Sequence, residues 1–237
     1  MLTDPPTTAD STPAPDRPVR VLIVDDDPFT REPVATILNL RPEIEVIGAV
    51  DGGAAAVAFV RHTRPDIVLM DLQMPGMDGI EATRQVLAEV KTRVVALTTM
   101  VDLDTVLRVF DAGGDGYILK GDGPVTLVED VLAAARGDAI LPPRYARAVI
   151  ERSTSAGGSD QRREALARLD LLTERERATA RLVATGGTNA EIAAAMHVSE
   201  STMKTHLTQA LAKLGLDNRM QLGILVDRAG ETPPPAP

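Results

Sequence analysis

Short apolar runs alternate with amphipathic stretches between residues 19 and 140 of the chain. The apolar runs predict β-strands at 20–25, 45–50, 67–71, 94–98 and 116–119. Apolar residues at helical spacing predict α-helices at 28–40, 54–62, 79–90, 105–112 and 125–136. Strands and helices in this alternation indicate an α/β fold, a doubly wound five-stranded parallel sheet. Pro33 lies inside the first helix beyond its first turn, so we expect that helix to start late or to kink.

The pattern changes near residue 169 to short helices with capping signals. Thr173 and Thr188 each precede a helical stretch and have a Glu three residues later, which is the capping-box arrangement. Ser199 precedes a third helix, Gly215 ends it, and a last helix is expected at 220–228. Two helices joined by a tight turn, with the second one longer, predict a small all-α helix-turn-helix domain.

The third of these helices has an apolar and a polar side when its residues are placed at about 100° intervals. The apolar stripe comprises Met203, Leu207, Ala210, Leu211 and Leu214. The opposite side carries Ser201, Lys204, Thr205 and Thr208. One ammonium and three hydroxyls suit phosphates and base edges in a DNA major groove. A solvated helix face is the alternative interpretation of the same pattern.

The 237-residue chain is expected to contain two domains and three connecting or terminal segments. We predict a disordered leader at 1–18, the α/β domain at 19–140, a linker at 141–168, the helix-turn-helix domain at 169–228 and a disordered tail at 229–237. The chain has no Cys, which excludes disulfides and thiolate metal sites. We expect no membrane association and a cytoplasmic location, because the sequence has neither a run of about 18 apolar residues nor a secretion signal.

Reactive side chains gather at the carboxyl ends of the predicted strands, where open α/β sheets bind ligands. Asp25 and Asp26 end the first strand, Asp71 the third and Thr98 the fourth, and Lys120 follows the fifth. Carboxylates that converge in this way favour a hard cation such as Mg²⁺. Together with the hydroxyl and the ammonium they suggest phosphoryl chemistry, in which one carboxylate becomes an acyl phosphate.

Four motifs, in this order, resemble the flavodoxin-like receiver domain of two-component response regulators. They are Val24-Asp25-Asp26-Asp27-Pro28, the run from Asp71 to Gly79, Leu97-Thr98-Thr99, and Gly116-Tyr117-Ile118-Leu119-Lys120. The resemblance implies that Asp71 accepts a phosphoryl group, that Lys120 contacts this group, and that Thr98 and Tyr117 are a switch pair. It implies as Mg²⁺ ligands Asp25, Asp26, Asp71 and the backbone carbonyl of Gln73.

Residues 172–222 resemble the LuxR-type helix-turn-helix. The matching motifs are Leu172-Thr173-x-Arg175-Glu176, Thr188-Asn189-x-Glu191-Ile192-Ala193, Ser199-x-x-Thr202-Met203-Lys204-x-His206, Lys213-Leu214 and Arg219. The resemblance implies base contacts by Lys204, Thr205 and Thr208. It implies DNA-backbone contacts by Asn189, Ser201 and Arg219. The whole chain thus resembles a NarL/FixJ-type response regulator, whose expected partners are a sensor histidine kinase, double-stranded DNA and, on activation, a second copy of the chain.

The net charge of −9 argues against nucleic acid as a partner. The excess lies outside the helix-turn-helix domain, because seven acidic and seven basic residues cancel between residues 169 and 228. A neutral domain gains little non-specific affinity from DNA phosphates. We therefore expect a monomer to bind weakly and a dimer on two half-sites to be required.

Two other functions agree with parts of the sequence. Asp71 could be the nucleophile of a magnesium-dependent phosphatase, but Gln73 is a poor proton shuttle and the second domain would have no purpose. A protein-binding adaptor that never touches DNA is the second alternative, and Lys204 with its hydroxyl neighbours argues against it. We therefore expect a transcription regulator and not an enzyme.

The sequence also suggests how the regulator switches. A phosphoryl group that draws Thr98 inward leaves space that Tyr117 can fill, which changes the surface nearby. Without that group, the linker lets the receiver lie against Lys204 and its neighbours and shield them. Phosphorylation is then expected to release this contact and to promote a dimer.

Overall fold

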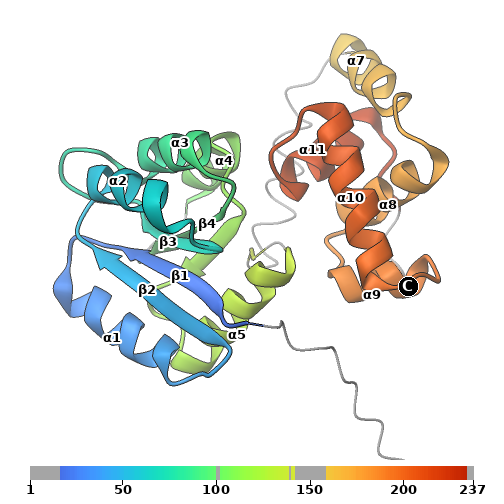
Figure 1. Cartoon of the computed structure of the whole chain (residues 1–237). Helices are drawn as coiled ribbons and strands as arrows, with labels where there is room; N and C mark the ends of the chain where they lie inside the picture. The colour runs from blue at the N-terminus through green and yellow to red at the C-terminus, as the bar shows by residue number, and fades with distance from the viewer. Residues whose placement is uncertain (1–16, 100–101, 139, 142–158, 234–237) are drawn as a thin grey trace, which may run out of the picture.

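The computed structural model describes residues 17–99, 102–138, 140–141 and 159–233 (Figure 1). The first domain contains β1 (Val19–Val24), β2 (Ile44–Val50), β3 (Ile67–Asp71), β4 (Arg93–Thr98) and β5 (Gly116–Leu119). These strands pair in parallel in the order β2-β1-β3-β4-β5. The predicted parallel sheet is confirmed, and each predicted strand lies within one residue of its observed bounds.

Helices cover both faces of the sheet (Figure 1). On one face lie α1 (Pro28–Asn39) and α5 (Pro124–Arg136), and on the other α2 (Gly53–Thr63), α3 (Gly79–Glu89) and α4 (Leu103–Asp111). The central strands are therefore buried on both sides, which explains their nearly continuous apolar sequences. The strand order reverses between β1 and β3, so the loops after these two strands flank the crevice where such sheets bind ligands.

The first helix begins at Pro28 and contains Pro33 without an interruption in its assignment. Asp27 caps it, because its carboxylate accepts a hydrogen bond from the backbone N–H of Phe29 at 2.9 Å. Pro28 suits the first helical position, where a backbone donor is not needed. The prediction of a late start is therefore wrong, and the loop that carries the acidic residues leads directly into α1.

The second domain contains α7 (Ser159–Leu169), α8 (Glu174–Ala184), α9 (Asn189–Ala195), α10 (Glu200–Leu214) and α11 (Arg219–Ala229). The predicted capping boxes are present at the starts of α8 and α9. The apolar side of α10 enters the core of this domain with Met203, Leu207, Ala210 and Leu214. The helix-turn-helix domain is confirmed, with the polar side of α10 directed away from its core.

The described residues extend the helical domain beyond its predicted bounds. All of α7 except Leu169 lies within the predicted linker 141–168, and Ala165 from this stretch packs into the domain core together with Leu169. Glu231, in the predicted tail, accepts hydrogen bonds from Arg177 and Arg181. Most of the predicted leader, the tether and the end of the tail lie at 1–16, 142–158 and 234–237, outside the described residues. Among the described helices, none combines the length and the apolar character that crossing a membrane requires.

Candidate functional site

Three carboxylates meet at the carboxyl ends of β1 and β3. Asp25 and Asp26 directly follow β1, and Asp71 is the last residue of β3, its neighbour in the sheet. One carboxylate oxygen from each residue lies within 4.8 Å of the other two. Asp25 is fully buried and Asp71 is 5% exposed, while Asp26 is half-buried. Because like charges this close disfavour ionisation, the cluster requires a positively charged group.

Lys120 supplies part of that positive charge. Its Nζ lies 2.8 Å from Asp25 Oδ2 and 2.9 Å from Asp71 Oδ2. Its backbone N–H donates to the carbonyl of Thr98 at 2.8 Å, which fixes Lys120 beside the end of β4. Burial opposes the ammonium charge, but the contacts with Asp25 and Asp71 outweigh burial and raise the pKa of Lys120. Burial also raises the pKa of Asp25, and Lys120 partly offsets this effect.

The pocket contains a carboxylate oxygen that suits a cation. Asp25 Oδ2 is buried, and within the described part of the chain no donor approaches it with hydrogen-bond geometry, although Lys120 Nζ is close. Asp71 Oδ1 accepts a hydrogen bond from the backbone N–H of Gln73 at 3.2 Å, so the backbone of Gln73 adjoins the carboxylates. An oxygen-only donor set of this kind fits a hard divalent cation such as Mg²⁺. The residues that could hold it are those predicted, namely Asp25, Asp26, Asp71 and Gln73.

Both predicted switch residues are buried next to this pocket. Thr98 ends β4 and is 4% exposed, and Tyr117 in β5 is 1% exposed. The Tyr117 hydroxyl donates to the backbone carbonyl of Thr105 in α4 at 2.6 Å. Its ring meets Phe110 edge-on, with centroids 6.0 Å apart. Because both side chains are buried, a change in the position of Thr98 would repack buried groups around Tyr117.

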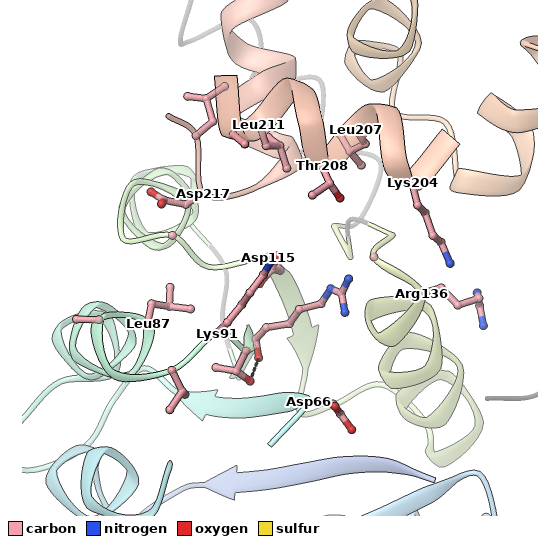
Figure 2. A pocket seen from close by; sticks show the side chains of 18 of the residues that line it. Asp66, Leu87, Lys91, Asp115, Arg136, Lys204, Leu207, Thr208, Leu211 and Asp217 are labelled. Carbon is pink, nitrogen blue, oxygen red and sulfur yellow. Dashed lines mark hydrogen bonds between the residues drawn. The ribbon is translucent and has the colours of Figure 1, made fainter. Parts of the chain in front are cut away.

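The polar side of α10 is divided between solvent and the receiver. Lys204 and Thr208 face the receiver across a cleft of about 820 Å³ (Figure 2). The cleft is lined on the receiver side by residues that include Lys91, Asp115 and Arg136. Ser201 and Thr205 are exposed, and the Thr205 hydroxyl donates to the carbonyl of Ser201 at 2.9 Å. A cleft of this volume is typical of small-molecule sites and is too small for a DNA duplex.

Asn189 and Arg219, the residues expected at the DNA backbone, are buried against the segment after α5. The Asn189 backbone N–H donates to Asp138 Oδ1 at 2.9 Å, and its Nδ2 donates to the Arg136 carbonyl at 2.7 Å. Arg219 Nη1 donates to Asn189 Oδ1 at 3.3 Å and lies 3.8 Å from Asp138 Oδ1. Burial lowers the pKa of Arg219, and Asp138 partly opposes this. Sequence reasoning missed Asp138, because a residue after a helix-ending glycine gives no local signal of a partner in another domain.

The comparisons with known proteins cover both domains. Residues 21–132 match the family model of the response regulator receiver domain, and residues 170–226 match that of the bacterial regulatory proteins of the luxR family. The chain is 36% identical over 211 residues to the transcriptional regulatory protein LiaR of Bacillus subtilis. The match covers 89% of this chain and 97% of LiaR, which favours a regulator over the phosphatase and adaptor alternatives.

Solved structures agree with this assignment. A two-component response regulator of the LuxR family from Aurantimonas sp. SI85-9A1 is 33% identical, with a TM-score of 0.53 over 57% of this chain and 97% of that one. A structure of two RcsB dimers bound to two parallel DNAs shares the fold at 22% identity, with a TM-score of 0.52 over 92% of this chain and 100% of that one. The chain therefore belongs to the response regulators that join a receiver domain to a LuxR-type DNA-binding domain and regulate transcription.

Proposed function

We propose that Asp71 accepts a phosphoryl group from a sensor histidine kinase and that this modification controls sequence-specific DNA binding in the cytoplasm. The observation that supports this most directly is the contact of Lys120 with Asp25 and Asp71, at 2.8 and 2.9 Å. Burying charged groups is costly unless they are paired. The Lys120 ammonium is partly exposed between two carboxylates at the ligand-binding edge of the sheet, where it can also pair with an incoming phosphoryl group.

The transfer reaction needs a nucleophile, a cation and donors for the phosphoryl oxygens. An Asp71 carboxylate oxygen attacks phosphorus in line, the new O–P bond forms as the N–P bond to the kinase imidazole breaks, and the imidazole leaves with the electron pair and is protonated. Lys120 then pairs with the phosphoryl oxygens, and the Thr98 hydroxyl donates to them. When bound, Mg²⁺ would offset the negative charge of the carboxylates and the phosphoryl group. Its proposed ligands are Asp25, Asp26, Asp71 and the carbonyl of Gln73.

Phosphoryl uptake tests this assignment. The full chain is incubated with Mg²⁺ and a radiolabelled small acyl phosphate, and the label that stays on the protein is measured. We expect Asp71→Asn to lose the uptake, because an amide is not a nucleophile at neutral pH. Asp51→Asn is the matched control, since Asp51 is an exposed aspartate that follows the neighbouring strand β2. Wild-type labelling of the Asp71→Asn protein would overturn the assignment.

DNA binding is proposed for a homodimer. The base-facing candidates Lys204, Thr205 and Thr208 share one side of α10, and Ser201 precedes them on that side. Opposite charges in the domain cancel, so one copy gains little from DNA phosphates. Two copies on two half-sites combine their contacts. The RcsB structure, which shares the fold, contains dimers on DNA.

The described arrangement is proposed to be the form that does not bind DNA. Asn189 and Arg219 are 1% and 8% exposed because the receiver covers them. Lys204 and Thr208 face the cleft (Figure 2). A duplex can reach these four residues only after the domains separate, and phosphorylation of Asp71 would favour that separation.

A further inference from the structure

A buried asparagine joins the two domains at a second place. Asn218 is 2% exposed and immediately precedes α11. Its Nδ2 donates to the backbone carbonyls of Gly114 at 2.9 Å and of Phe110 at 3.4 Å. Its Oδ1 accepts from the backbone N–H of Gln221 at 2.9 Å, which is the N-cap bond of α11. One amide group therefore caps a helix of the DNA-binding domain and binds the receiver at the same time.

Gln221 brings a second amide to the same part of the receiver. Its Nε2 donates to the Phe110 carbonyl at 3.1 Å, and its Oε1 accepts from the backbone N–H of Asp217 at 2.9 Å. Phe110 lies in the last turn of α4, where its carbonyl also accepts from the backbone N–H of Gly113 at 3.0 Å, and Gly114 lies in the turn that follows. We call Asn218 and Gln221 the amide latch. Both members supply donors to the carboxyl-terminal end of α4.

Apolar packing continues this contact towards the phosphoacceptor pocket. Met220 and Ile224 of α11 pack against the receiver cluster that contains Phe110 and Tyr117. Tyr117 belongs to the same cluster, and its hydroxyl binds the Thr105 carbonyl in α4. One packed group of side chains thus connects the predicted switch residue, α4 and the first turns of α11.

We propose that the amide latch responds to the position of α4 and releases the DNA-binding domain when α4 shifts after phosphorylation. This inference rests on the proposed function of Asp71. Hydrogen bonds between amides and carbonyls weaken steeply when their geometry is lost, so a shift of the carbonyls by about 1 Å is sufficient to break the latch. Buried amides without acceptors are unfavourable, which leaves the separated, hydrated domains as the preferred state.

The variant Asn218→Asp tests the latch in the full chain. Asp is as good an N-cap residue as Asn, so the cap of α11 is kept. The carboxylate has no donor, and it repels the two carbonyl oxygens that Nδ2 now binds. We expect the unphosphorylated variant to bind DNA about tenfold more tightly than the unphosphorylated wild type, a typical coupling between sites. The probe is a duplex selected from a random pool by the phosphorylated wild-type protein. Small-angle scattering without DNA should show a larger radius of gyration.

Two further variants keep the test decisive. Gln221→Glu also replaces a donor with an acceptor, so it should likewise increase the DNA affinity and the radius of gyration of the unphosphorylated protein. This variant tests the latch if Asn218→Asp does not fold. Gln161→Glu on the exposed side of α7 adds the same charge to the same domain without touching the receiver, and it should change neither measurement. Unchanged DNA affinity and scattering in a folded latch variant would refute the latch. If the phosphorylated wild type selects no duplex, the proposed DNA function fails instead, and the scattering alone still tests the latch.

Discussion

The proposed phosphoacceptor pocket and the proposed DNA-reading surface are assembled in different ways. The pocket is built within one domain, from residues at the ends of adjacent strands, and Lys120 already contacts Asp25 and Asp71. The residues predicted to contact DNA are distributed over α9, α10 and α11. Two of them, Asn189 and Arg219, bind the receiver instead of solvent.

This difference shows where regulation can act. The residues that form the pocket, Asp25, Asp26, Asp71 and Lys120, all belong to the receiver domain. The receiver covers Asn189 and Arg219, so under the proposed function the affinity for DNA depends on the domain arrangement. Phosphorylation of a pocket within the receiver can thus control access to a surface of the other domain that the receiver covers.

Loss of the Lys120 ammonium should have the largest effect on the stability of the protein. Lys120→Met keeps most of the side-chain volume but leaves buried Asp25 and Asp71 without their counter-charge. Breaking a buried charge pair on one side typically lowers stability by about 3–5 kcal/mol. We expect a loss near the lower end of this range in urea unfolding at neutral pH, since the Lys120 side chain is 13% exposed.

The exposed Lys91 provides the control for this variant, because Lys91→Met removes the same charge from the receiver surface. Added Mg²⁺ should restore part of the lost stability in Lys120→Met, since a cation that binds only the folded protein stabilises it. Chelation should remove that gain. Equal unfolding midpoints of the wild type and Lys120→Met would contradict the view of the pocket as a charge-balanced unit.

The pocket could be predicted from the sequence because its residues follow a rule of the fold. Apolar runs indicate the strands, and parallel strands bring their carboxyl ends to one edge of the sheet. Asp25, Asp71 and Lys120 lie at those ends in the sequence. The contacts by which the receiver covers the predicted DNA-contacting residues could not be predicted in the same way. Asp138 and Asn218 meet partners across the domain boundary, and no periodicity or cap relates residues 50 or more positions apart.

Composition concealed other parts of the fold. The predicted linker extends to residue 168 and so includes most of α7, yet Ala165 and Leu169 pack into a core. Glu231 reads as part of a polar tail, and only the folded domain brings Arg177 and Arg181 to it. Tertiary packing decided both segments, whereas the capping boxes of α8 and α9 could be predicted from local pairs alone.

The reading side of α10 should show an intermediate effect. In the phosphorylated protein, Lys204→Ala and Thr208→Ala should each weaken specific DNA binding by about 1–3 kcal/mol if they contact bases. Gln161→Ala is the control, because Gln161 is exposed on α7, away from the helices that carry the predicted DNA contacts. The measurement is a titration with the selected duplex, with circular dichroism to confirm the fold. Unaltered affinity in both variants would remove α10 as the recognition helix.

The smallest effect is expected where the receiver covers the DNA-reading surface. Asp138→Ala removes the carboxylate that accepts from the Asn189 backbone N–H and faces Arg219. The Arg136 and Gly137 carbonyls still bind these residues, so the domains lose only part of their contact. We expect the unphosphorylated protein to bind the duplex more tightly by about 1 kcal/mol, the usual net value of one hydrogen bond.

The phosphorylated protein should hardly respond to Asp138→Ala, because its domains are proposed to be separated already. Asp51→Ala provides the control for loss of a receiver charge, since Asp51 is exposed beyond β2. An equal gain in both phosphorylation states would mean that Asp138 repels DNA through its charge and does not close the domains. A gain confined to the unphosphorylated state would show that the carboxylate occupies donors that DNA needs. The pocket, whose residues all lie within the receiver, should then take up phosphoryl label at the wild-type rate.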